Sequence, residues 1–153
     1  MSALETMENI LNRPNLMSAD LKFCLINQAK VPYKIDGTRV QPNNVNDFVD
    51  FSMLCIDNLS DYAGIGISVQ ASNICAIDVD HCFKSPFIIE SSDDRGKDVL
   101  SIFKDHAYCE FSFSGTGLRI LFRHPIIENY ANDFYIKNSK NEMEFYQPGK
   151  SYR

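Results

Sequence analysis

The chain lacks several features that would indicate a secreted, membrane-spanning or zinc-binding protein. Its 153 residues contain no tryptophan and no apolar run near the ~18–20 residues of a transmembrane helix. Its five cysteines are odd in number and no two have CxxC spacing, which argues against a disulfide framework and against a zinc finger. The N-terminus is acidic and lacks the order of a signal peptide, so we expect a cytoplasmic protein without a membrane partner.

Several catalytic signatures are also missing. No GxxxxGK[ST] loop occurs, which excludes a P-loop ATPase, and no Ser-His-Asp or Cys-His arrangement has local support. The net charge of −5 argues against a general DNA-coating protein. The acidity is uneven, however, since residues 101–153 carry seven Lys and Arg against six acids. Length and composition predict one globular domain.

The order of apolar and turn segments predicts an α+β fold with five or six strands and two or three helices. Strands follow one another more often than they alternate with helices, which disfavours a doubly wound sheet. Helices are predicted over 3–12, after a cap at Asn44 or Asn46, and over a segment that begins at 91–94. Strands are predicted at Leu21–Ile26, Ala63–Val69, Asn73–Val79, Tyr108–Phe113, Leu118–Phe122 and Glu142–Tyr146, with 63–79 as a hairpin-like block.

An Asp-Val-Asp sequence at the end of an apolar run is the sharpest local feature. Alternate residues of a strand share a face, so Asp78 and Asp80 should point the same way, roughly 6–7 Å apart at the backbone. Carboxylates so close repel each other unless a counter-charge lies nearby. Oxygen ligands suit Mg²⁺ or Mn²⁺, so we predict that this pair holds a divalent cation. The alternative is a strand that ends in two solvated acids.

A glycine-rich turn joins two later strands. Ser112 and Ser114 alternate with aromatic residues that are expected in the core, and Gly115-Thr116-Gly117 then leads into a strand with Arg119. Glycines let a ligand approach backbone N–H groups, hydroxyls bond phosphate oxygens, and the arginine fork clamps phosphate. The alternative is an ordinary β-hairpin.

An acid within the last apolar strand completes the candidate site. Glu144 is predicted to join Asp78 and Asp80 as a third carboxylate, with Tyr146 on the same face by period two. On its own, such a glutamate would face solvent. His81 follows the aspartates, and either orients one of them or has a structural role.

Taken together, these motifs resemble the primase-polymerase (prim-pol) domain of phage and plasmid replication proteins, within the archaeo-eukaryotic primase superfamily. The resemblance covers roughly residues 14–150 and rests on the order of acid-x-acid, Ser-x-Ser-Gly-x-Gly-x-basic and a late strand Glu. Further matches are Lys30-Val31-Pro32-Tyr33, Asp36-Gly37 and Gly64-Ile65-Gly66-Ile67. Many family members have His where this chain has Arg119, and arginine keeps the charge but cannot shuttle protons near neutral pH.

The resemblance implies a fold, a reaction and partners. The expected fold is an RRM-like mixed or antiparallel sheet with flanking helices and an N-terminal α/β part, in one catalytic domain over 1–153. That domain would be the N-terminal fragment of a longer replication protein with a helicase region, in the host cytoplasm if phage-encoded. The implied ligands are Mg²⁺ or Mn²⁺ on Asp78, Asp80 and Glu144, with a deoxynucleoside or nucleoside triphosphate on Ser112, Ser114, Gly115, Thr116, Gly117, Arg119 and Tyr146.

The reaction implied is template-directed nucleotidyl transfer to a 3′-hydroxyl on single-stranded DNA with a primer. A Toprim enzyme is disfavoured because its Glu precedes the acid pair. A rolling-circle initiator is disfavoured because no His-x-His occurs. The main alternative is a nucleotide- or single-strand-binding replication module without catalysis, in which aromatic residues stack on bases. The aromatic candidates are Phe111, Phe113, Tyr130, Phe134 and Tyr135.

Overall fold

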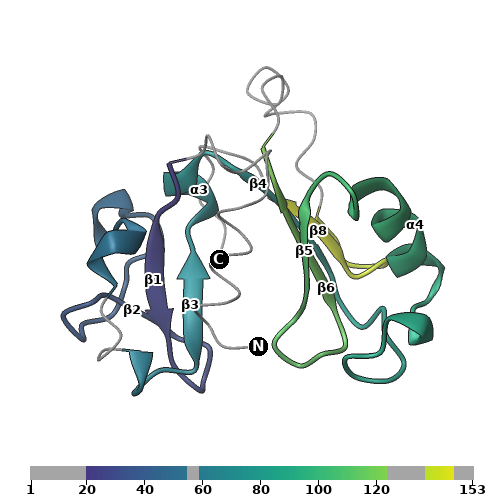
Figure 1. Cartoon of the computed structure of the whole chain (residues 1–153), viewed down its shortest axis with the longest axis horizontal. Coiled ribbons are helices and arrows are strands. Elements are labelled where there is room, and N and C mark those ends of the chain that lie inside the picture. Colours follow the sequence, from purple (N-terminus) through teal and green to yellow (C-terminus); the bar gives the residue numbers. More distant parts are fainter. Residues whose placement is uncertain (1–19, 55–58, 124–136, 147–153) are drawn as a thin grey trace.

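Two antiparallel sheets lie side by side in the computed structural model, which describes residues 20–54, 59–123 and 137–146 (Figure 1). The smaller sheet has the order β2-β1-β3. Its strands are β1 (Phe23–Ile26), β2 (Pro32–Tyr33) and β3 (Gly64–Ile67). The α+β class predicted from the sequence is therefore confirmed, and both sheets are antiparallel rather than mixed.

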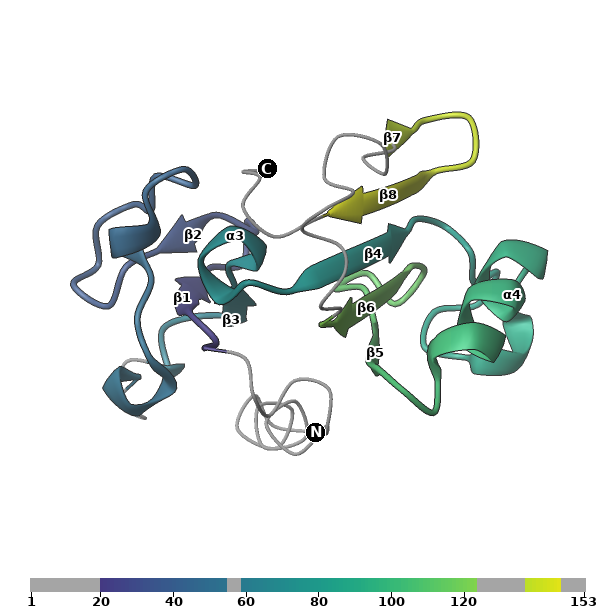
Figure 2. The same ribbon diagram turned by 90° about the horizontal axis from the view of Figure 1, so that it is seen from above.

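The larger sheet has five strands in the order β5-β6-β4-β8-β7. Its strands are β4 (Cys75–Val79), β5 (Tyr108–Phe111), β6 (Leu118–Phe122), β7 (Lys137–Asn138) and β8 (Met143–Tyr146). The central strand, β4, carries the first of the two aspartates. Its neighbours β6 and β8 follow it much later in the chain, so this sheet brings distant segments together (Figure 2).

Short helices connect the strands. Helix α3 (Val69–Ser72) begins where the Ser68 side chain accepts a hydrogen bond from the Ala71 N–H. Helix α4 (Asp94–Phe103) begins at Asp93, whose carboxylate accepts from the Gly96 N–H, and both are typical N-caps. The 3₁₀ helices are η1 (Val45–Asp47), η2 (Phe51–Met53) and η3 (Ile89–Ser91). No helix among the described residues is long and apolar enough to cross a membrane.

Apolar side chains cover both faces of the five-stranded sheet. The face toward the three-stranded sheet packs Ala76 and Leu121 against Phe23. The opposite face packs Ile120 and other residues against helix α4, which lies on the far side of the sheet from β1–β3 (Figures 1 and 2). The face toward the three-stranded sheet is apolar along only part of its length, because charged residues replace apolar ones toward the end of β4.

Several predictions about local structure were wrong. Segment 63–79 is not a hairpin, because α3 intervenes and β3 and β4 belong to different sheets. The helix predicted after Asn44 is replaced by η1 and η2. Phe113, expected in the core, is 54% exposed. The helix predicted over 3–12 lies outside the described residues, as do Cys55, Tyr130, Phe134 and Tyr135.

Candidate functional site

A row of charged residues crosses all five strands of the larger sheet, and its last member is Lys137 on β7, the Cα partner of Glu144. Glu110 on β5 is the Cα partner of Arg119 on β6, which pairs with Asp78 on β4, which in turn pairs with Glu144 on β8. Directly opposed residues of antiparallel strands point to the same face. The register therefore places Asp78, Glu144 and Arg119 on one face and adds Glu110, which sequence reasoning did not include in the site. Its alternation with Ser112 and Ser114 was the signal available for it.

The Arg119 guanidinium lies between two carboxylates. Its Nη2 is 3.7 Å from Asp78 Oδ2, and its Nη1 is 3.6 Å from Glu110 Oε1. Both distances are longer than a usual N–H···O hydrogen bond. The arginine therefore balances the charge of both acids without being tightly bound to either.

Asp78 is the most unusual carboxylate of the row. Its side chain is 21% exposed, and Oδ1 is buried with no hydrogen-bond partner. Burial raises the pKa of Asp78 above its usual value, the negative charges of Asp80 and Glu144 raise it further, and Arg119 opposes them. A buried carboxylate oxygen without a partner fits a cation ligand, because a cation would stabilise the charge that burial disfavours.

Asp80 lies just beyond the end of β4. Its side chain is exposed, and its backbone N–H donates to the Glu142 carbonyl at 2.8 Å. That hydrogen bond ties the chain after β4 to the residue that precedes β8. The two aspartates are therefore held beside the strand that carries Glu144.

The Glu144 carboxylate accepts a hydrogen bond from a residue of its own strand, β8. The Tyr146 hydroxyl donates to Glu144 Oε2, since the two residues share a face of β8. Burial raises the pKa of Tyr146, and its bond to Glu144 raises it further, so the phenol remains a donor at neutral pH. Among the described residues, no group of three or more His, Cys, Asp or Glu side chains is arranged to hold a metal ion. The three predicted carboxylates share a region, but they are not already gathered around one point.

The glycine-rich turn adjoins the same end of β4. A Cβ on Gly117 would lie 2.9 Å from Ser112 Oγ and 3.0 Å from the Val79 carbonyl oxygen, so a larger residue would require these neighbours to shift. Gly115 has φ +76°, and a Cβ there would lie 2.6 Å from the Phe87 ring. The Thr116 carbonyl also accepts from the Phe83 N–H at 2.9 Å. These contacts place the turn beside the segment that contains Asp80.

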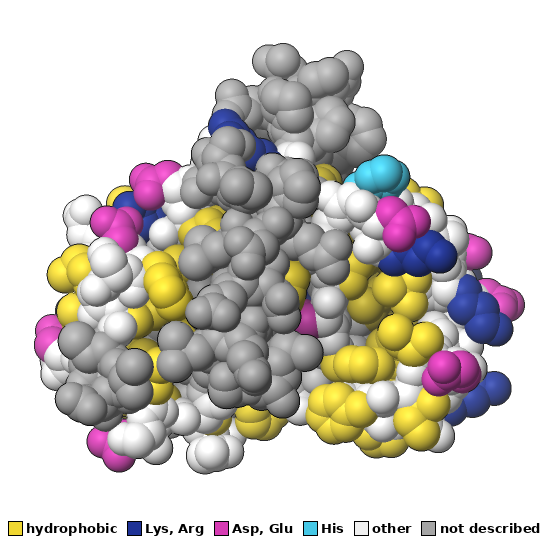
Figure 3. Space-filling view, in the orientation of Figure 1, with side chains coloured by type: hydrophobic (Ala, Val, Ile, Leu, Met, Phe, Trp, Pro, Cys, Tyr) yellow, Lys and Arg dark blue, Asp and Glu magenta, His cyan; other side chains and the backbone are white. Residues whose placement is uncertain are grey.

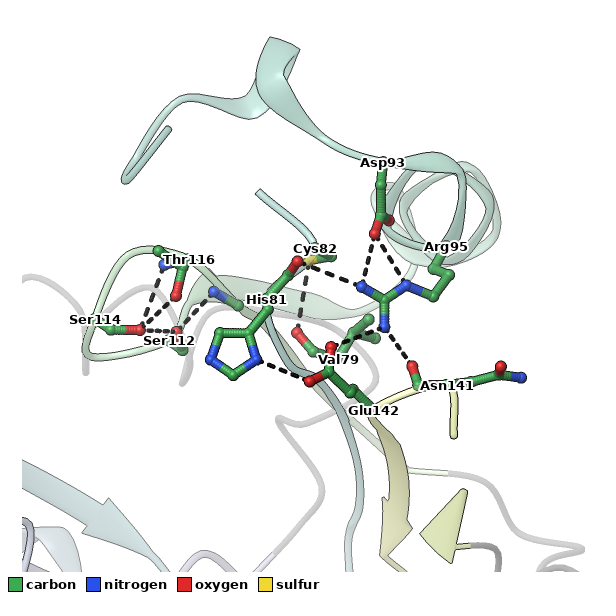
Figure 4. Close-up of polar contacts among 11 residues, drawn as sticks. Val79, His81, Cys82, Asp93, Arg95, Ser112, Ser114, Thr116, Asn141 and Glu142 are labelled. Atoms are coloured by element: carbon green, nitrogen blue, oxygen red, sulfur yellow. Dashed lines mark hydrogen bonds and ion pairs between the residues drawn. The ribbon is translucent and has the colours of Figure 1, made fainter. Parts of the chain in front are cut away.

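Three hydroxyls form a chain along this turn (Figure 4). Ser112 Oγ is 3.1 Å from Ser114 Oγ, which is 2.8 Å from Thr116 Oγ1. The backbone N–H groups of the two glycines are already used within the turn, since Gly115 donates to the Ser112 carbonyl and Gly117 to Ser112 Oγ. A phosphate at this turn would therefore meet hydroxyls rather than the glycine N–H groups that we expected from the sequence.

The His81 side chain pairs with Glu142 rather than with Asp78 or Asp80. Its Nδ1 lies 3.2 Å from Glu142 Oε1, while Arg95 donates twice to Asp93 and also to the backbone carbonyls of His81 and Asn141 (Figure 4). Arg95 thus joins the start of α4, the end of β4 and the β7–β8 turn. Sequence reasoning missed both Arg95 and Glu142, since neither belongs to a motif.

Exposed apolar side chains gather over the glycine-rich turn and the segment before α4 (Figure 3). Phe87, Ile89 and Phe113 are more than half exposed, and Ile88 is 49% exposed. Lys30, from the loop between β1 and β2, lies 5.5 Å from the centre of the Phe113 ring. The surface beside the candidate site therefore combines aromatic rings with a basic side chain.

Comparison of the chain with known protein families, with curated proteins and with solved structures finds no match. The resemblance to the prim-pol domain thus remains a prediction that rests on the motifs. The geometry around Asp78 is the structural evidence that bears on the site.

Proposed function

We propose that this chain is the nucleotidyl-transfer module of a template-directed DNA primase or polymerase, with the RRM-like prim-pol fold that its motifs resemble. One observation carries the proposal. Asp78 lies on the central strand of the larger sheet, directly opposite Glu144, and the hydroxyl-bearing turn adjoins the end of that same strand. Three motifs that are far apart in the sequence therefore meet at one end of one sheet.

Each residue has a role in this proposal. Asp78, Asp80 and Glu144 bind Mg²⁺ or Mn²⁺, with the unpartnered Oδ1 of Asp78 as the first ligand atom. Bound divalent ions would activate the 3′-hydroxyl and stabilise the pyrophosphate that leaves. Ser112, Ser114 and Thr116 bond triphosphate oxygens through their hydroxyls, while Arg119 balances phosphate charge. Gly115 and Gly117 shape the turn, and Tyr146 orients Glu144.

The test is primer extension on a single-stranded DNA template with Mg²⁺ or Mn²⁺ and nucleoside triphosphates. We expect Asp78→Ala and Asp80→Ala each to reduce extension to background, because each removes a metal ligand. Asp105→Ala is the matched control, since Asp105 is exposed after α4, outside the charged row, and should leave extension unchanged. Extension that survives both aspartate changes would refute the assignment.

A binding module without catalysis is the second candidate. It is favoured by the guanidinium beside Asp78 and by the absence, among the residues described, of a gathered metal site. The exposed Phe113 with Lys30 above it would suit stacking on unpaired bases. Such a module would bind single-stranded DNA or nucleotide, show no incorporation with either metal, and lose no Mn²⁺ affinity on Asp78→Ala.

A further inference from the structure

Arg119 has a partner on each side of it, and the two partners are held differently. On one side is Asp78, whose second oxygen has no hydrogen bond. On the other is Glu110, whose Oε2 accepts from the Tyr108 hydroxyl at 3.0 Å and whose Oε1 faces Arg119. Glu110 is thus fixed at one oxygen and offers the other to the guanidinium.

A divalent cation at Asp78 would be repelled by the guanidinium where it lies now. Like charges a few ångströms apart repel strongly, even at the effective dielectric of a protein surface. The Arg119 side chain is 42% exposed and is not tightly bound to Asp78, so it has room to withdraw. Glu110 lies on the side away from Asp78 and is the acid that can retain it.

We propose that Arg119 is an internal counter-charge that competes with the divalent cation for Asp78, and that Glu110 is a positioning residue that draws Arg119 aside when the cation binds. The inference rests on the proposed function only in taking Asp78 as a cation ligand. Arginine suits this role because Nη1 and Nη2 address two carboxylates at once, whereas a lysine ammonium is a single point charge.

The proposal predicts opposite effects on Mn²⁺ affinity for two substitutions that each remove a charge. In Arg119→Gln the competitor is gone, so Mn²⁺ should bind about three- to tenfold more tightly than in the unchanged chain. In Glu110→Gln the guanidinium has Asp78 as its remaining partner in the row, so Mn²⁺ should bind more weakly. Lys104→Gln removes one positive charge from the end of α4 and should leave the affinity unchanged.

A double-mutant cycle separates this mechanism from a simple field effect. Glu110 also attracts a cation directly, and that attraction would persist without Arg119. If Glu110 acts through Arg119, Glu110→Gln should weaken Mn²⁺ binding less when Arg119 is already glutamine. The fold-loss of Mn²⁺ affinity should then be at least about threefold smaller than in the chain that keeps Arg119. A purely structural contribution of Glu110 would not depend on whether residue 119 carries a charge.

Isothermal titration of each variant with MnCl₂ alone, with circular dichroism as a check of folding, measures these quantities. Binding by Arg119→Gln that is no tighter than in the unchanged chain would overturn the proposal. So would an equal loss from Glu110→Gln in both backgrounds, or no Mn²⁺ binding by either the unchanged chain or Arg119→Gln. If Arg119→Gln does not fold, Arg119→Lys replaces it in the cycle. In the Arg119→Lys background, Glu110→Gln should reduce the Mn²⁺ affinity less than it does when Arg119 is present. An equal reduction in both backgrounds contradicts the proposal.

The two proposals fail in different ways. If the cycle behaves as expected but no primer is extended, the polymerase assignment fails and the charge competition stands. If extension depends on Asp78 but Arg119→Gln binds Mn²⁺ no better, the competition is wrong and the polymerase assignment stands.

Discussion

Asp78 on β4 and Glu144 on β8 are direct Cα partners, so two acidic side chains face each other across adjacent antiparallel strands. Opposed like charges in a sheet are destabilising. Here Arg119 lies on the other side of Asp78, and Tyr146 donates to Glu144. These contacts reduce the repulsion but leave Asp78 Oδ1 without a partner.

We expect Mn²⁺ to stabilise the fold and Asp78→Asn to abolish that gain. A cation that binds only the folded chain raises the free energy of unfolding by about 2.7 kcal/mol at 100 times its Kd. The asparagine keeps the shape of Asp78 but removes the charge. In EDTA we expect the variant to be at least as stable as the unchanged chain, since ionised Asp78 is disfavoured by burial.

Thermal unfolding with EDTA or with MnCl₂ measures this gain. Asp105→Asn is the control, because it removes an exposed acid and should keep the full response to Mn²⁺. A Tm that rises equally with Mn²⁺ in Asp78→Asn and in the unchanged chain would mean that the ion binds elsewhere.

Gly115→Ala should destabilise the turn by two separable effects. Its φ of +76° costs a non-glycine residue about 1–2 kcal/mol, and the added methyl would meet the Phe87 ring. Adding Phe87→Ala should remove the steric part of the loss in unfolding free energy and leave the part that is due to the backbone conformation. Urea unfolding of the two single variants and of the double variant measures the coupling. Strict additivity would show that the ring does not press on this glycine.

Ionisation of Glu110 should lower stability as the pH rises. Burial raises the pKa of Glu110 above its ordinary value of 4.5, and Arg119 and Tyr108 only partly oppose this. Protonated Glu110 therefore favours the folded state, and this contribution is complete below about pH 4.5 and is lost as the pH rises through the raised folded pKa. In metal-free buffer, Glu110→Gln should gain Tm relative to the unchanged chain as the pH is raised from about 4.5 toward neutrality. A difference in Tm that is constant across that range would contradict the prediction.

The buried thiols should resist alkylation until the chain unfolds. Burial raises the pKa of Cys24 and Cys82 to about 11 and that of Cys75 to about 12. At pH 8 the reactive thiolate is then about one thousandth of each thiol or less. Iodoacetamide followed by peptide mass spectrometry should label the part-exposed Cys109 before these three, and urea should remove the difference. Rapid native labelling of Cys75 would show that β4 is not buried as described.

The two isoleucines Ile120 and Ile102 provide a matched test of the core. Ile120 is fully buried on β6, and its replacement by alanine should cost about 2–5 kcal/mol of unfolding free energy. Ile102 is 63% exposed on α4, so the same substitution there should change the unfolding free energy by no more than about 0.5 kcal/mol. Chemical unfolding of both variants checks the difference, and similar losses would contradict the placement of α4.

Local patterns were sufficient for most of the strands. The predicted strand at Leu118–Phe122 has the same bounds as β6, and those at Asn73–Val79 and Glu142–Tyr146 differ from β4 and β8 only at their starts. The helix predicted to begin at 91–94 begins with Asp93 as its cap. The helix predicted after Asn44 is absent, because Phe51 and Leu54 have helical spacing but the chain over 44–54 makes two single 3₁₀ turns.

Alternation and turn residues in the sequence determined the α+β class, the faces of the strands and the short list of acids and hydroxyls. Only the tertiary structure decided which strands pair and in which register, because pairing depends on packing between segments that local propensity does not describe. The strand pairing put β3 and β4 in different sheets. The register placed Glu144 opposite Asp78 and placed Arg119 between Asp78 and Glu110 rather than at the glycine-rich turn. Long-range charge relations of this kind arise only when the sheet has assembled.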